Sequence, residues 1–162
     1  MDARERELTE AIRAGREAVS AADGVLECLD RVAKWSTADA FGIDLADFPK
    51  YAALEDAHSR TLELQIRLNA FRSELADVEL DEELQVQLEG LLKFADFFFD
   101  GLLADLAVRD RIDRARTSVG RAKDRVGALL GRLESEIGAN RRDRADKLDR
   151  IEKIVLETNG QE

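Results

Sequence analysis

The chain has 162 residues, enough for one domain with a hydrophobic core and too few for two substantial domains. Apolar residues make up 44% of the sequence, which excludes wholesale disorder, while charged residues reach 37%, well above the usual quarter. The net charge of −10 is unsuited to generic nucleic-acid binding, because an acidic protein repels the phosphate backbone.

The first predicted helix spans about Asp2 to Trp35. Apolar or small residues recur along it at spacings of three and four, the period of a packed helical face. The members of this face are Leu8, Ile12, Gly15, Val19, Ala22, Leu26, Leu29 and Ala33. A flanking row of apolar residues widens the face, which is typical of a bundle helix with several neighbours. The segment Ser36 to Phe48 is predicted to connect this helix to the next.

The second predicted helix runs from about Pro49 to Val78 and carries two apolar stripes. The main stripe comprises Leu54, Ala57, Thr61, Leu64, Leu68, Phe71, Leu75 and Val78. A second stripe on another side contains His58, Leu62 and Ile66 at spacings of four. Because an exposed apolar stripe needs a cover, we expect either the preceding connection or another subunit to lie over it.

The third predicted helix begins after Asp81, which can cap it, and meets no obvious stop before Ile137. Its apolar spacing changes register between Leu102 and Val108. We therefore expect one helix over residues 82–137, either continuous or bent near Gly101.

The triplet Gly138-Ala139-Asn140 resembles a tight turn before a last helix that ends near Thr158. This helix has a narrow apolar face of Leu148, Ile151 and Val155. We expect it to fold back on residues 112–137 as a C-terminal helical hairpin. The predicted single domain, 1–162, then consists of an acidic body and a mildly basic hairpin: residues 1–107 hold 11 basic and 24 acidic side chains, and residues 108–162 hold 14 and 11.

A few polar residues have the spacing of metal ligands. Glu55 and His58 are three positions apart, so both lie on one helix face, as the ligands of di-metal helical bundles do. Asp96 and Asp100, one turn apart on the third helix, could add oxygen ligands. His58 is the only histidine, however, whereas such sites normally use two of these pairs. An ordinary helix-edge role for His58 is therefore favoured, and no cofactor is predicted.

Four of the seven phenylalanines lie between Lys93 and Asp100, namely Phe94, Phe97, Phe98 and Phe99. Three consecutive aromatic residues point around most of a helix, so they cannot all face one neighbour. We expect this helix to be buried on several sides, including a subunit interface. The alternative is an apolar ligand pocket with Asp96 or Asp100 as its polar group.

Arginine-rich stretches lie at residues 109–125 and 141–150. Aspartates interrupt both stretches and no aromatic residues accompany them, so ion pairs on solvated helix faces are favoured over contacts with phosphates.

The cellular setting is predicted from a few residues. Cys28 is the only cysteine, which excludes an internal disulfide and fits a reducing compartment. The most apolar stretch, Leu91 to Val108, contains four charged residues, too many for a membrane span. We expect a soluble, cytoplasmic protein.

These observations predict an all-α fold, an antiparallel bundle of long amphipathic helices with coiled-coil-like faces and a C-terminal hairpin. The favoured function is a non-enzymatic interaction or assembly protein. It would form a homo-oligomer, with a dimer favoured, or bind a helical partner through Leu62, Ile66 and the phenylalanine cluster. The alternatives are a small metal-dependent bundle enzyme and a nucleic-acid-associated accessory protein that uses the arginine-rich end.

Overall fold

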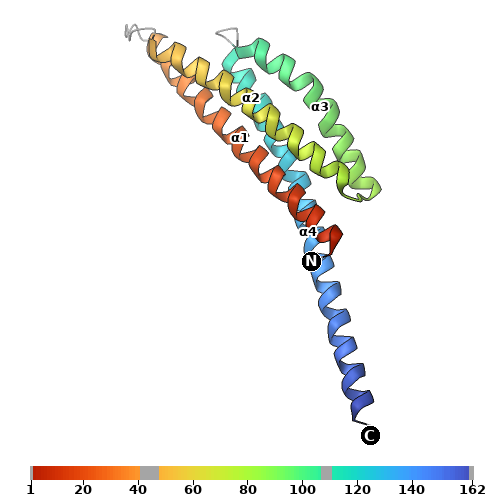
Figure 1. Cartoon of the computed structure of the whole chain (residues 1–162). Coiled ribbons are helices and arrows are strands. Elements are labelled where there is room, and N and C mark those ends of the chain that lie inside the picture. Colours follow the sequence, from red (N-terminus) through yellow and green to blue (C-terminus); the bar gives the residue numbers. More distant parts are fainter. Residues whose placement is uncertain (1, 41–47, 107–110, 161–162) are drawn as a thin grey trace.

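The structure, a computed structural model, describes residues 2–40, 48–106 and 111–160. Within these ranges the chain forms helices and no strands. The helices are α1 (Ala3–Ala40), α2 (Phe48–Asp77), α3 (Glu82–Leu106) and α4 (Ile112–Asn159). The predicted all-α fold class is confirmed (Figure 1).

Helices α1 and α2 form an antiparallel pair. The ion pair between Arg31 and Asp56 joins them at one end, and the pair between Glu17 and Arg67 joins them further along, each at 2.7 Å. As residue numbers fall along α1 they rise along α2, so the two helices run in opposite directions.

Helix α4 runs antiparallel to both α1 and α3. Lys123 contacts Asp23 of α1 and Arg116 contacts Asp30, each at 2.6 Å. On the other side, the guanidinium of Arg125 lies 4.7 Å from the centre of the Phe94 ring in α3. The result is an up-down-up-down bundle whose neighbouring helices are antiparallel, as predicted (Figure 1).

The core lies along the helix faces that the apolar spacing predicts. Leu8 and Leu29 of α1 are fully buried, as are Leu64 and Phe71 of α2. Nine residues of α4 are also buried: Ile112, Ala115, Val119, Ala122, Val126, Leu129, Leu130, Leu133 and Ile137. All of these residues belong to one continuous cluster, so the first half of α4 is part of the bundle.

Aspartate side chains cap the N-termini of two helices. The carboxylate of Asp81 accepts a hydrogen bond of 2.8 Å from the backbone N–H of Leu84, so the predicted cap of α3 is confirmed. Asp2 plays the same part for α1, where it accepts from the N–H of Glu5 at 2.7 Å.

The prediction of one long helix over residues 82–137 is wrong. Helix α3 continues through Gly101 without a break, ends at Leu106, and is followed by α4, which runs the opposite way from Ile112. The change of register between Leu102 and Val108 therefore marks a reversal of the chain rather than a bend. A reversal buries the apolar faces of both halves against each other, which a straight helix cannot do.

The predicted C-terminal hairpin is also wrong. Gly138, Ala139 and Asn140 are ordinary helical residues, and α4 passes through them to Asn159. One glycine costs a helix only about 1 kcal/mol relative to alanine, so it does not by itself force a turn. The last part of α4 projects beyond the other helices instead of folding back (Figure 1). None of the described helices is long and apolar enough to span a membrane.

Candidate functional site

Residues 141–160, which we call the tail, form the part of α4 that extends past the bundle (Figure 1). Every residue of the tail is exposed. Five large apolar residues are among them: Leu148, Ile151, Ile154, Val155 and Leu156, each at least half exposed. The tail is the densest group of exposed large apolar side chains in the described part of the chain.

Most of the apolar residues of the tail share one face of the helix. Leu148, Ile151 and Val155 follow each other at spacings of three and four, so they form a stripe, and Ile154 lies beside it. Leu156 follows Ile151 by five residues, which at about 100° per residue places it toward the opposite side. We call Leu148, Ile151 and Val155 the tail stripe.

The tail stripe lies in line with the buried face of α4. Leu133 and Ile137 of that face are covered by the bundle. The same alternation of three and four continues through Arg144 to Leu148. The same face of α4 is thus buried where it packs in the bundle and exposed to solvent along the tail.

A buried carboxylate marks the boundary between the covered and open parts of this face. The side chain of Glu5, only 8% exposed, accepts a hydrogen bond of 2.8 Å from Arg141 and forms an ion pair of 2.9 Å with Arg144. The hydrogen bond from Arg141 is the largest cause of a lowered pKa for Glu5, burial opposes it, and the charge of Arg144 adds to it. This ion-paired group joins the start of α1 to the start of the tail.

The candidate metal ligands do not come together. Glu55 and His58 are exposed on α2, and Asp96 and Asp100 are exposed on α3. Throughout the ranges that the structure describes, no three His, Cys, Asp or Glu side chains are placed to share a metal ion. The structure thus gives no geometric support to the metal-site hypothesis.

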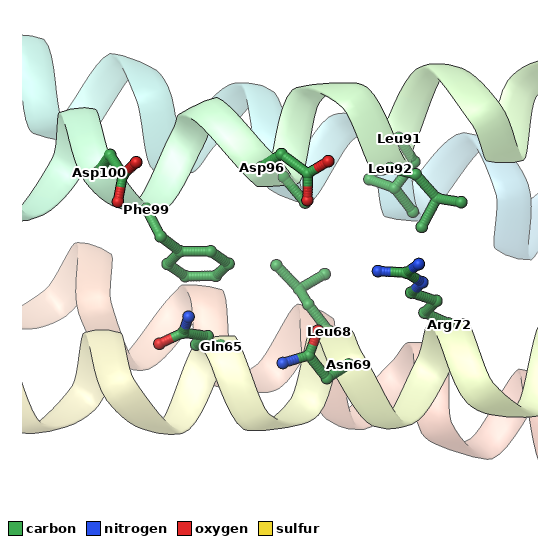
Figure 2. A pocket seen from close by; sticks show the side chains of 10 residues that line it. Gln65, Leu68, Asn69, Arg72, Leu91, Leu92, Asp96, Phe99 and Asp100 are labelled. Atoms are coloured by element: carbon green, nitrogen blue, oxygen red, sulfur yellow. The ribbon is translucent and has the colours of Figure 1, made fainter.

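Asp96 and Asp100 instead line a shallow groove of about 160 Å³ between α2 and α3 (Figure 2). Leu68 and Phe99 point toward each other between the two helices, while Arg72 lies on the α2 side. Gln65 and Asn69 of α2 complete the polar edge of the groove. Its volume is below that of typical small-molecule sites, which enclose about 300–1,000 Å³.

The phenylalanine cluster divides into buried and exposed members. Phe98 and Phe99 are buried with ring centres 4.8 Å apart, and Phe94 stacks on Phe98 at 5.2 Å. Phe97 points away from the core and is 82% exposed. Of the predicted interface residues, Leu62, Ile66 and Phe97 have substantial free surface, whereas Phe98 and Phe99 are enclosed within the chain.

The basic residues of α4 mostly face acidic partners. Arg116, Lys123 and Arg132 pair with acidic residues of α1 or α3. In the tail, Lys147 and Lys153 pair with aspartates one turn earlier. These contacts match the ion-pair interpretation of the arginine-rich stretches and leave few free charges for a polyanion.

Cys28 is enclosed between α1 and α2. Its thiol is 1% exposed and donates to Asp56 at 3.1 Å, while Arg31 donates to both groups. Burial is the first cause of the raised pKa of Cys28, and the hydrogen bond to Asp56 adds to it. A thiol held protonated in this way is a poor nucleophile, so Cys28 has a packing role.

The sequence pattern correctly identified the apolar face of the last helix, but it did not indicate that this face is exposed to solvent. Leu148, Ile151 and Val155 were expected to be covered by a hairpin, and the link between Glu5 and the tail was missed. The available signal was the regular spacing, which continues through Gly138 without a slip.

Comparisons with known proteins add no family. The chain matches no protein-family model, no curated protein and no solved structure.

Proposed function

We propose that this protein is a non-enzymatic interaction and assembly protein that binds a helical partner through its tail. The observation that carries the proposal is the tail stripe, an apolar helix face outside the bundle that no other described part of the chain covers. Contiguous exposed apolar surface is typical of protein interaction sites. A helix packing along the stripe would bury residues spaced as in a coiled coil.

The charges of the tail support a protein partner rather than nucleic acid. Residues 141–160 hold six basic and five acidic side chains, interleaved along the helix. Mixed charge beside an apolar stripe is typical of helix-to-helix interfaces, whereas a phosphate backbone calls for a surplus of basic groups. With Cys28 as the only cysteine, we also propose a reducing, cytoplasmic setting.

The proposal is tested by recovering the tagged protein, expressed at native abundance, together with whatever it binds. Ile151→Glu places a charge in the tail stripe, and Leu156→Glu makes the same change on the other side of the same tail. At least one bound protein, which can be a second copy of the chain, should be lost with Ile151→Glu and kept with Leu156→Glu. If wild type and both variants recover the same bound proteins, the result contradicts the proposal.

A further inference from the structure

We infer that the tail stripe binds a second copy of itself, so that two chains dimerise through antiparallel tails. This inference rests on the proposed function, because it names the partner of the same surface. Two observations on the chain support that partner, the place of α1 beside α4 and the distribution of charge, and the contact that results is symmetric.

Helix α1 determines the direction in which a second tail can lie. It runs antiparallel to α4 and reaches the start of the tail, where Glu5 binds Arg141 and Arg144. The tail stripe continues in line with the face of α4 that the bundle covers. A helix seated on the stripe and antiparallel to α4 therefore extends α1 end to end and meets no other element. A second tail fits this position.

A parallel pair of tails is excluded by the same geometry. Two parallel α4 helices would continue side by side from the tails into the bundles. Helix α1 already packs on α4 there, as the contacts of Asp23 and Asp30 with Lys123 and Arg116 require. The second α4 would need the space that α1 fills.

The charge distribution favours the tail as the meeting point of two copies. Residues 1–140 hold 19 basic and 29 acidic side chains, a net charge of −10, whereas the tail has a net charge of +1. Two acidic bundles repel each other. Antiparallel tails that overlap over residues 145–160, beyond the arginines bound to Glu5, hold the bundles at opposite ends of an overlap of about 24 Å, at a rise of about 1.5 Å per residue. That separation is several Debye lengths at physiological salt, about 8 Å each, so the repulsion is screened.

The antiparallel arrangement also limits the assembly to two copies. Each stripe is covered by the other in a two-fold contact, so both stripes are buried and no binding surface is left for a third copy. Two helices in contact over about 24 Å make a small interface. We therefore expect a dimer that forms at micromolar concentration and dissociates on dilution.

Sedimentation velocity of the full chain between about 1 and 200 µM, a range chosen to bracket micromolar affinity, tests the dimer. Wild type and Leu156→Glu should both dimerise, and Ile151→Glu should weaken the dimer at least tenfold. Both substituted residues are more than half exposed, so the bundle should stay folded, which circular dichroism verifies. A wild type that is monomeric throughout, or a dimer that Ile151→Glu leaves unchanged, overturns the inference. The variant Ile66→Glu then shows whether an observed dimer uses α2 instead.

Distances between spin labels test the direction. Labels are attached through Arg142→Cys and Glu157→Cys, one near each end of the tail, while the buried Cys28 stays unlabelled. Antiparallel tails predict a short distance between position 142 of one copy and 157 of the other, and a long distance between the two 142 positions. A short distance between the two 142 positions overturns the inference. If the pure protein is monomeric while Ile151→Glu still removes a cellular partner, this inference fails and the proposed function stands.

Discussion

At the scale of single residues, the interior of the bundle depends on one close approach between helices. Gly15 of α1 faces Leu130 and Phe71 so closely that an added Cβ would lie 2.6 Å and 2.8 Å from their side chains. Both neighbours are buried, so neither can move without disturbing the core. A glycine at this position lets α1 pack against α2 and α4 at once.

Gly15→Ala should therefore destabilise the protein by about 1–3 kcal/mol through overpacking. Gly127→Ala is the matched control, because a Cβ added there meets nothing within 4 Å. That change should stabilise the protein by up to about 1 kcal/mol, the difference in helix propensity. Urea denaturation measures both, and equal effects would show that the contact at Gly15 does not exist.

The phenylalanine cluster offers a second matched pair. Phe98→Ala removes a buried ring that contacts two others, and we expect a loss of about 3–5 kcal/mol in unfolding free energy. Phe97→Ala alters an exposed ring on the same helix and should change the unfolding free energy by no more than about 0.5 kcal/mol. If Phe97→Ala lowered the denaturant midpoint more than Phe98→Ala does, Phe97 and not Phe98 would lie in the core, contrary to the structure.

At the scale of helices, the contact between Glu5 and the tail predicts a response to pH. The folded pKa of Glu5 lies below its ordinary value near 4.5, chiefly because of the hydrogen bond from Arg141. Its stabilising contribution is thus complete above the ordinary pKa and is lost as pH falls through the lowered folded pKa. Glu5→Gln should be less stable than wild type at pH 7, and the gap should close below about pH 4.5.

Urea midpoints of wild type and Glu5→Gln across pH 3–7 measure this gap. Other carboxylates titrate in the same range in both proteins, so only the difference between the two curves reports on Glu5. A gap that is constant across this range would contradict the contact with Arg141 and Arg144.

Two truncations test how α4 is divided between bundle and tail. Among the described residues, ending the chain after Asn140 removes only exposed ones, including the arginines that bind Glu5, so the bundle should stay folded. Ending it after Val108 removes the nine buried residues of α4. Seven of these are large apolar side chains. At about 1.5–3 kcal/mol each, their loss costs about 10–21 kcal/mol, which is as large as the usual total stability of about 5–15 kcal/mol.

Circular dichroism should therefore show native helicity and cooperative unfolding for the chain that ends at Asn140, and neither for the chain that ends at Val108. A folded Val108 truncation would restore the division into an acidic body and a separate hairpin that the sequence suggested.

The sequence predicted the helices and their buried faces because each face depends only on local spacing. Leu8 to Leu29 and Leu64 to Leu75 follow one helical period, and their burial follows from it. The chain reversal after Leu106 could not be located in this way. No glycine or proline lies between Leu102 and Ile112, and only the change of register marked the place.

The site was harder to predict for a related reason. Gly138 and Asn140 are good turn residues, but whether a turn forms depends on what the following segment can pack against. Glu5 and Arg141 are 136 positions apart in sequence, and no spacing rule connects them. Their contact appears only when α1 and α4 are placed side by side.

At the scale of the whole molecule, an acidic bundle carries a projecting, nearly neutral helix with one apolar face. The bundle buries a continuous core and needs no partner to do so, whereas the tail has no contact with the bundle beyond its first turns. A helical segment without tertiary packing is marginal in water and frays readily. Its order should therefore depend on the partner that covers it.

Amide hydrogen exchange of the full chain at two concentrations, one below and one above the dimer's dissociation constant, tests this account most directly. Residues 148–158 should exchange rapidly in dilute protein and become protected at the higher concentration, while the buried parts of α1 and α2 stay equally protected at both. Protection of the tail that is the same at both concentrations would contradict self-association through the tail stripe.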